Sequence, residues 1–138
     1  LFPLATLLTP NVPEAETLLG RRLRGPTDLV GAAQDLLATG ARAILLKGGH
    51  LRGPRIRDVL VDGESVTEFE HARLPAAARG TGCTLASAIA AGLARRMELR
   101  QAVQEAERFL QAAMRGAYRP GRGKRRALDP SAGNVNTF

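Results

Sequence analysis

The segment 79–89 reads RGTGCTLASAI and places two glycines and the chain's only cysteine where a loop turns into a helix. Gly80 and Gly82 can adopt positive φ, so the amides from Thr81 onward can converge on one point at the positive end of the helix dipole. Such a turn can hold a phosphate without a charged side chain. The same field favours the thiolate of Cys83, which could act as a base or a nucleophile.

The string GTGC also has a simpler interpretation. A glycine-rich helix start with a buried, unreactive cysteine is common, and short glycine motifs match many sequences by chance. On this string alone, the structural role is the more frequent of the two. Companion motifs are needed to decide between them.

The composition predicts one globular domain, because 138 residues with 44% apolar side chains can bury a core. A single cysteine excludes an internal disulfide. The apolar start, LFPLATLLTP, is too short to span a bilayer and contains two prolines. These features predict a cytoplasmic protein without a membrane partner.

The net charge of +7 would suit nucleic acid, but only 4% of the residues are aromatic and none is tryptophan. Single-strand platforms need aromatic side chains between the basic ones. We therefore expect no nucleic-acid partner, and we attribute the positive charge to a solvated, arginine-rich surface.

The pattern along the chain alternates strands with helices, which predicts a three-layer α/β domain. The predicted strands are 5–9, 41–47, 59–61 and 65–69, the last two forming a hairpin. One helix opens at Asn11 and runs to about Leu19, with Gly20 as its stop. A second is capped by Thr27 or Asp28 and ends at Gly40.

Two more helices follow the hairpin. One begins between residues 82 and 84, and the last extends over about 99–113. Apolar residues at helical spacing mark the buried faces of three of these helices: Leu29, Ala32, Ala33, Leu36 and Leu37; Leu85, Ala88, Ile89, Gly92 and Leu93; Leu99, Ala102, Val103, Ala106, Phe109, Leu110 and Ala113. The stretch 118–133, rich in glycine, proline and basic residues, is predicted to be a mobile surface loop.

Ligands of such domains bind at the carboxyl ends of the strands, and three groups lie there. Asn11 and Glu14 follow the first strand, Lys47 ends the second, and GTGC opens the helix after the hairpin. Asn11 and Glu14 also have the spacing of a capping box, and Lys47 could simply extend to solvent. Glu14 could instead hold magnesium, directly or through water. The two histidines have no neighbours at zinc-ligand spacing.

Four segments together resemble hydroxymethylpyrimidine/phosphomethylpyrimidine kinases of thiamine biosynthesis, which have the ribokinase-like fold. In order they read TPNVPEAETLLG, LLKGGHLRG, DVLVDG and GTGCTLASAIAAGLA. The resemblance covers roughly residues 1–117, and GNVNTF at the carboxyl end is similar to the family's closing segment. It implies transfer of the ATP γ-phosphoryl group to the hydroxymethyl group of the pyrimidine and then to its monophosphate. Related enzymes phosphorylate pyridoxine-type vitamins.

The resemblance also implies roles for individual residues. Asn11 and Glu14 match an NxxE motif associated with magnesium and phosphates, and Lys47 matches a lysine near the nucleotide phosphates. Cys83 matches the catalytic-base position, where most of the wider superfamily has aspartate. The anion hole corresponds to Gly80, Thr81 and Gly82. Arg79 departs from the family, which often has histidine there.

The chain is about half as long as these relatives, and the resemblance implies that the missing half is amino-terminal and holds most of the pyrimidine site. We therefore expect residues 1–117 to be the nucleotide-binding half of a ribokinase-like domain and residues 118–138 to be its basic loop and tail. The chain is then a partial enzyme that needs the other half. The alternatives are a non-catalytic ATP- or phosphate-binding module, or an inactive remnant that self-associates through its sheet edge.

Overall fold

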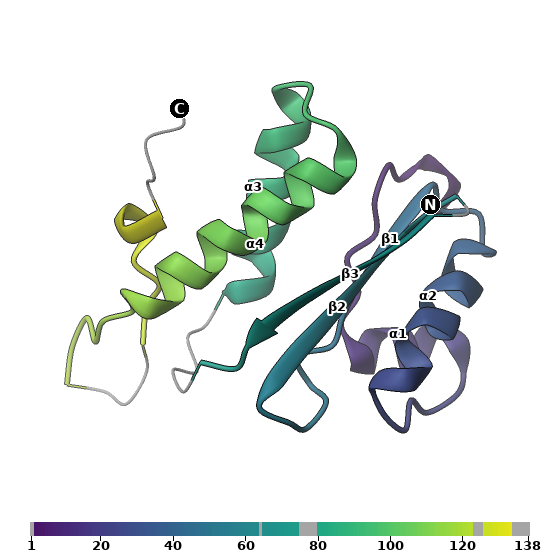
Figure 1. Ribbon diagram of the computed structural model, residues 1–138, viewed down its shortest axis with the longest axis horizontal. Helices are drawn as coiled ribbons and strands as arrows, with labels where there is room; N and C mark the ends of the chain where they lie inside the picture. Colours follow the sequence, from purple (N-terminus) through teal and green to yellow (C-terminus); the bar gives the residue numbers. More distant parts are fainter. Residues whose placement is uncertain (1, 64, 75–79, 123–125, 134–138) are drawn as a thin grey trace. The chain divides into compact units, whose positions relative to one another are not determined.

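The computed structural model describes residues 2–63, 65–74, 80–122 and 126–133. The chain folds into two compact units, Leu1–Arg73 and Leu74–Phe138, whose elements are labelled in Figure 1. The first unit contains a sheet with helices on it, and the second is built on a helix pair. Among the described residues, no helix is both long and apolar enough to cross a bilayer.

The sheet of the first unit has three antiparallel strands in the order β1-β2-β3. They are β1 (Ala43–Lys47), β2 (Arg55–Asp62) and β3 (Ser65–Ala72). Asp62 pairs with Ser65, which leaves a two-residue turn, and Gly63 in that turn has φ 57°. The predicted hairpin is confirmed, although its strands are longer than the predicted 59–61 and 65–69.

A short parallel segment lies along the free side of β1. Leu8 bridges Ile44 and Asn11 bridges Lys47, both in parallel. The Leu8 N–H donates to Ala43 O at 3.0 Å and Leu8 O accepts from the Leu45 N–H at 2.8 Å. The predicted strand 5–9 is thus reduced to isolated bridges, because Phe2–Leu4 forms a 3₁₀ turn and Pro10 has no N–H to continue the ladder.

Two helices pack on one face of the sheet (Figure 1). They are α1 (Val12–Leu19) and α2 (Leu29–Leu37), and α2 touches both β1 and β2. The predicted stripe of α2 is confirmed: four of its five residues are fully buried and Leu37 is partly buried. The core of this unit includes Leu29, Ala32, Ala33, Leu36, Ile44, Leu46, Val59 and Val61.

The predicted positions of the ends of these two helices are confirmed. α1 begins after Asn11 and ends at Gly20 with φ 65°, and Gly40, at φ 105°, closes the last turn of α2. Asp28 is the N-cap residue of α2, as predicted, but its side chain makes no capping hydrogen bond to the helix. A 3₁₀ turn, Pro26–Asp28, leads into the helix, and the Asp28 carboxylate accepts the Arg24 N–H at 2.9 Å instead.

The second unit pairs α3 (Thr81–Ala94) with α4 (Leu99–Arg115). Gly92 allows the close approach, because a Cβ there would lie 3.0 Å from Ala102 Cβ and 3.2 Å from Met97 Sδ. α3 begins one residue before the predicted range. Most of the two predicted stripes is buried, namely Leu85, Ile89, Gly92, Ala102, Val103, Ala106, Leu110 and Ala113.

The described part of 118–133 is attached to the helix pair. Tyr118 and Ala127 exchange two backbone hydrogen bonds of 3.1 and 2.9 Å, and the 3₁₀ turn Pro130–Gly133 packs on α4. Hydrogen bonds from Ser131 to the Asp129 carboxylate lower the pKa of Asp129. Apart from this bridge and this turn, the described residues of the stretch form no helix or strand and most are exposed, so the predicted surface loop is confirmed, and its mobility stays a prediction. Residues 123–125 and the tail 134–138 lie outside the described residues.

Candidate active site

The start of α1 carries the capping box that the sequence allowed. Asn11 Oδ1 accepts the Glu14 N–H at 2.9 Å, and Glu14 Oε2 accepts the Asn11 N–H at 2.8 Å. Pro13 occupies the first turn, where its missing N–H costs nothing. Both side chains therefore cap the helix. A ligand would have to contact the side-chain atoms that make no hydrogen bond in the capping box.

Lys47 lies beside Asn11 at the carboxyl ends of two parallel segments. The two residues form a parallel bridge, and the Lys47 N–H donates to Pro10 O at 2.9 Å. The sequence predicted this proximity from strand ends alone. Lys47 is half-buried, as expected for a side chain whose stem packs while its ammonium group reaches a ligand or solvent.

The turn after Lys47 is held tightly against β2. Gly48 is buried, and a Cβ there would lie 2.1 Å from Arg57 O. Its N–H donates to Asp58 Oδ1 at 2.7 Å, and only 4% of Asp58 is exposed. The other oxygen, Asp58 Oδ2, lies 3.6 Å from His71 Nε2. This close contact and this hydrogen bond together restrict the backbone after Lys47.

Arg73 holds the rest of this loop. Its guanidinium donates to Gly49 O and Gly53 O at 2.8 Å each, and also to Leu51 O. The Arg73 N–H donates to Pro54 O at 2.8 Å. One side chain therefore binds three carbonyl oxygens in the loop between β1 and β2.

The GTGC segment opens α3 in the second unit. Gly80 is the N-cap with φ 82°, and the first helical hydrogen bond joins the Thr84 N–H to Gly80 O at 2.9 Å. The amides of Thr81, Gly82 and Cys83 precede that bond, so the helix leaves them for another acceptor. Cys83 is exposed, and the alternative interpretation as a buried cysteine is therefore wrong.

The seven predicted site residues thus form two groups. Asn11, Glu14 and Lys47 lie together at one end of the sheet, and Gly80 to Cys83 lie together at the start of α3. Arg79 lies outside the described residues. Sequence reasoning missed Asp58 and Arg73. A lone carboxylate leading the apolar run of β2 could have indicated Asp58, whereas no pattern indicated Arg73.

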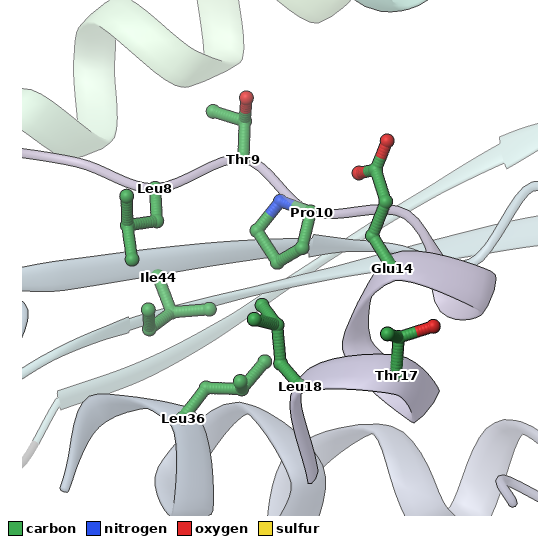
Figure 2. Close-up of a pocket in the computed structure, with 8 residues that line it drawn as sticks. All are labelled: Leu8, Thr9, Pro10, Glu14, Thr17, Leu18, Leu36 and Ile44. Carbon is green, nitrogen blue, oxygen red and sulfur yellow. The ribbon is translucent and has the colours of Figure 1, made fainter. Parts of the chain in front are cut away.

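A pocket of about 460 Å³ adjoins the first group (Figure 2). Figure 2 shows the aliphatic side chains of Leu18, Leu36 and Ile44 gathered together, with the Glu14 carboxylate directed away from them. The remaining lining residues are Leu8, Thr9, Pro10 and Thr17. This mainly apolar lining suits hydrocarbon rather than phosphate, so the pocket is not the predicted phosphate site.

The family model of phosphomethylpyrimidine kinase matches residues 1–127. The chain belongs to the phosphomethylpyrimidine kinase family. It is 40% identical over 118 residues to the hydroxymethylpyrimidine/phosphomethylpyrimidine kinase of Aquifex aeolicus, covering 85% of this chain and 46% of that protein. It is 48% identical over 124 residues to the thiamine biosynthesis bifunctional protein ThiED of Geobacter sulfurreducens, covering 89% and 25% of the two chains.

Solved structures confirm the ribokinase-like α/β fold of this family member. The ADP complex of Bacillus subtilis pyridoxal kinase matches with a TM-score of 0.88 and 33% identity, covering 97% of this chain and 51% of that one. Staphylococcus aureus pyridoxal kinase with AMP-PCP matches with a TM-score of 0.89 and 29% identity, covering 99% and 50%. The chain spans about half the length, or less, of the curated relatives it matches.

Replacing Asn11 separates its capping role from a ligand role. Asn11→Ala should lower the free energy of unfolding by about 1 kcal/mol, because the Glu14 N–H loses its acceptor. Asn11→Asp should keep the cap but weaken binding of Mg–ATP, since a carboxylate repels phosphate. Urea unfolding and nucleotide titration measure the two effects. Wild-type nucleotide affinity in Asn11→Asp would contradict the ligand role.

Proposed function

We propose that this chain is the nucleotide-binding part of an ATP-dependent hydroxymethylpyrimidine/phosphomethylpyrimidine kinase. It transfers the γ-phosphoryl group to the hydroxymethyl group of the pyrimidine and, in a second reaction, to the monophosphate. The family match over residues 1–127 carries this proposal. The adjacent Asn11 and Lys47 and the free amides at the start of α3 support it.

The proposed roles follow from the charge that moves during phosphoryl transfer. The Lys47 ammonium group and the Asn11 side chain bind the nucleotide phosphates. The amides of Thr81, Gly82 and Cys83 face the phosphoryl oxygens, with Gly80 providing the turn, and stabilise their charge in the transition state. The Cys83 thiolate takes the proton of the acceptor hydroxyl. The oxygen of that hydroxyl bonds to the γ-phosphorus, and ADP leaves as its bond to the γ-phosphorus breaks.

The Glu14 carboxylate would suit a magnesium ion that accompanies the nucleotide. Magnesium uses one or two protein carboxylates and keeps several waters. Glu14 is exposed and uses Oε2 in the capping box, so Oε1 or a water on it would hold the ion. In the described part of the chain, no group of three metal ligands includes Glu14, which disfavours an all-protein cage. When bound, the ion neutralises charge on the phosphates.

The family match favours a pyrimidine acceptor over a pyridoxal-like one. The matching family model is that of phosphomethylpyrimidine kinase, and the Aquifex aeolicus relative of that kind is 40% identical. A pyridoxine-type acceptor is the second candidate, because the fold match to pyridoxal kinases covers almost the whole chain.

The proposal assigns residues 1–117 to the nucleotide-binding half and residues 118–138 to the basic loop and tail of the same domain. We further propose that the protein is cytoplasmic, where the small-molecule substrate is available, and that an amino-terminal half is its partner. A non-catalytic ATP-binding module, or a homo-oligomer of an inactive remnant, would need no such partner.

A phosphoryl-transfer assay tests the proposed activity. The chain is mixed with the amino-terminal half of a family relative, γ-labelled ATP and magnesium, and offered each acceptor separately. We expect label on hydroxymethylpyrimidine and on its monophosphate only when both halves are present. Transfer to pyridoxal alone would contradict the proposed pyrimidine acceptor. Nucleotide binding without any transfer would favour the non-catalytic ATP-binding module.

A further inference from the structure

The loop between β1 and β2 directly follows Lys47 and lies at the end of the sheet where β3 also ends. Because the sheet is antiparallel, Lys47 at the end of β1 pairs with Asp58, and Arg55 at the start of β2 pairs with Ala72. Arg73, the residue after β3, therefore starts beside the loop. The Arg73 side chain extends from the end of β3 to the loop between β1 and β2.

The contacts of Arg73 use the particular shape of arginine. Three nitrogens of one planar group donate to the carbonyl oxygens of Gly49, Leu51 and Gly53, which alternate along the loop. A lysine ammonium group is a point charge and cannot match this fork. The loop also closes on itself through the Leu51 N–H and Gly48 O at 2.9 Å. The guanidinium group thus holds a preformed turn along most of its length.

Asp58 fixes the other end of the same loop. It lies directly opposite Lys47 in the sheet and accepts the N–H of the next residue, Gly48, at 2.7 Å. A buried carboxylate is costly unless it is hydrogen-bonded, so this bond strongly restricts the peptide that follows Lys47. The backbone on the carboxyl side of Lys47 is held by Asp58, and the loop beyond it by Arg73.

We propose that Asp58 and Arg73 are positioning residues that fix the 48–53 loop and thereby hold Lys47 ready for the nucleotide phosphates. This inference rests on the proposed function of Lys47. Neither residue needs to touch the nucleotide. Their effect is to keep the binding-competent conformation populated, and apparent affinity falls in proportion to any loss of that population.

Arg73→Lys in the full 138-residue chain tests the proposal, with Arg55→Lys as the matched control. Arg55 is also an exposed arginine at this end of the sheet, but it pairs with Glu70 at 2.6 Å and not with the loop. Hydrogen exchange of amides 48–53 and titration with Mg–ATP are measured, together with urea unfolding. Arg73→Lys should leave the loop open most of the time, and so speed exchange in the loop by well over tenfold and weaken Mg–ATP binding by about threefold to tenfold.

The control, Arg55→Lys, should change neither the hydrogen exchange of the loop nor the affinity for Mg–ATP. The urea midpoint of Arg73→Lys should stay near that of the wild type. If the wild type binds Mg–ATP and Arg73→Lys binds it equally well, the positioning role is overturned while the proposed function stands. If the wild-type chain binds no Mg–ATP, the proposed function of Lys47 fails and this inference fails with it.

Asp58 provides a second pair of variants. Asp58→Asn keeps a side-chain oxygen for the Gly48 N–H, whereas Asp58→Ala removes it. We expect Asp58→Asn to retain most of the loop protection and most of the Mg–ATP affinity, and Asp58→Ala to lose both. Equal losses in the two variants would overturn the hydrogen-bond role of Asp58, and the Arg73 variants decide the matter if Asp58→Ala does not fold.

Discussion

Replacing Cys83 with alanine is expected to lower kcat of the kinase reconstituted from both halves by about 10²–10⁴-fold, the usual contribution of a positioned general base. The exposed thiol lies in the first turn of α3, beside backbone amides that the helix leaves for another acceptor. Affinity for Mg–ATP should change little, because the thiol acts on the acceptor hydroxyl. Steady-state kinetics and nucleotide titration measure the two effects.

Two further variants sharpen this test. Ser87→Ala changes another exposed side chain one turn along α3 and should leave kcat unaltered. Cys83→Asp introduces the residue that the resemblance gives at this position in most of the wider superfamily, and it should retain part of the turnover. Wild-type turnover in Cys83→Ala would reject the assignment of Cys83 as the base.

Gly48→Ala should destabilise the first unit by about 1–3 kcal/mol or more, because overpacking a tight site forces the backbone to move. The added Cβ would lie 2.1 Å from Arg57 O and 3.2 Å from Leu29 Cδ1. Urea unfolding followed by circular dichroism gives the free energy of unfolding for comparison with the wild type.

Gly49→Ala is the matched control, since a Cβ added at this next residue would have no atom within 4 Å. It should cost well under half as much as Gly48→Ala. Equal destabilisation by the two variants would show that the flexibility of glycine, and not the close contact of Gly48 with β2, accounts for the cost of substitution in this loop.

Much of the fold follows from local sequence patterns. The stripe on α2 from Leu29 to Leu36 and the apolar run of β1 each bury a face that the residue spacing already defines. Gly20 and Gly40 end helices because their positive φ suits glycine. These features depend on neighbours within a few residues, so a single sequence carries them.

Features that depend on contacts distant in sequence were not predictable. Arg73 reaches three carbonyl oxygens about twenty residues earlier in the chain, and no periodicity marks such a contact. The backbone bridge between Tyr118 and Ala127 also joins residues that no sequence pattern paired. A sequence pattern also cannot choose between two roles that use the same residues. Asn11 and Glu14 fit both a capping box and a phosphate motif.

We propose that this chain binds nucleotide phosphates through Lys47 at the end of β1. Isothermal titration of the 138-residue chain with Mg–ATP, compared with Lys47→Ala and with Arg42→Ala as an exposed control, tests it most directly. We expect one site in the wild type and in the control, and an affinity lower by about 10–100-fold in Lys47→Ala, because a charge-assisted contact is lost. No binding by the wild type, or equal binding by Lys47→Ala, would contradict the claim.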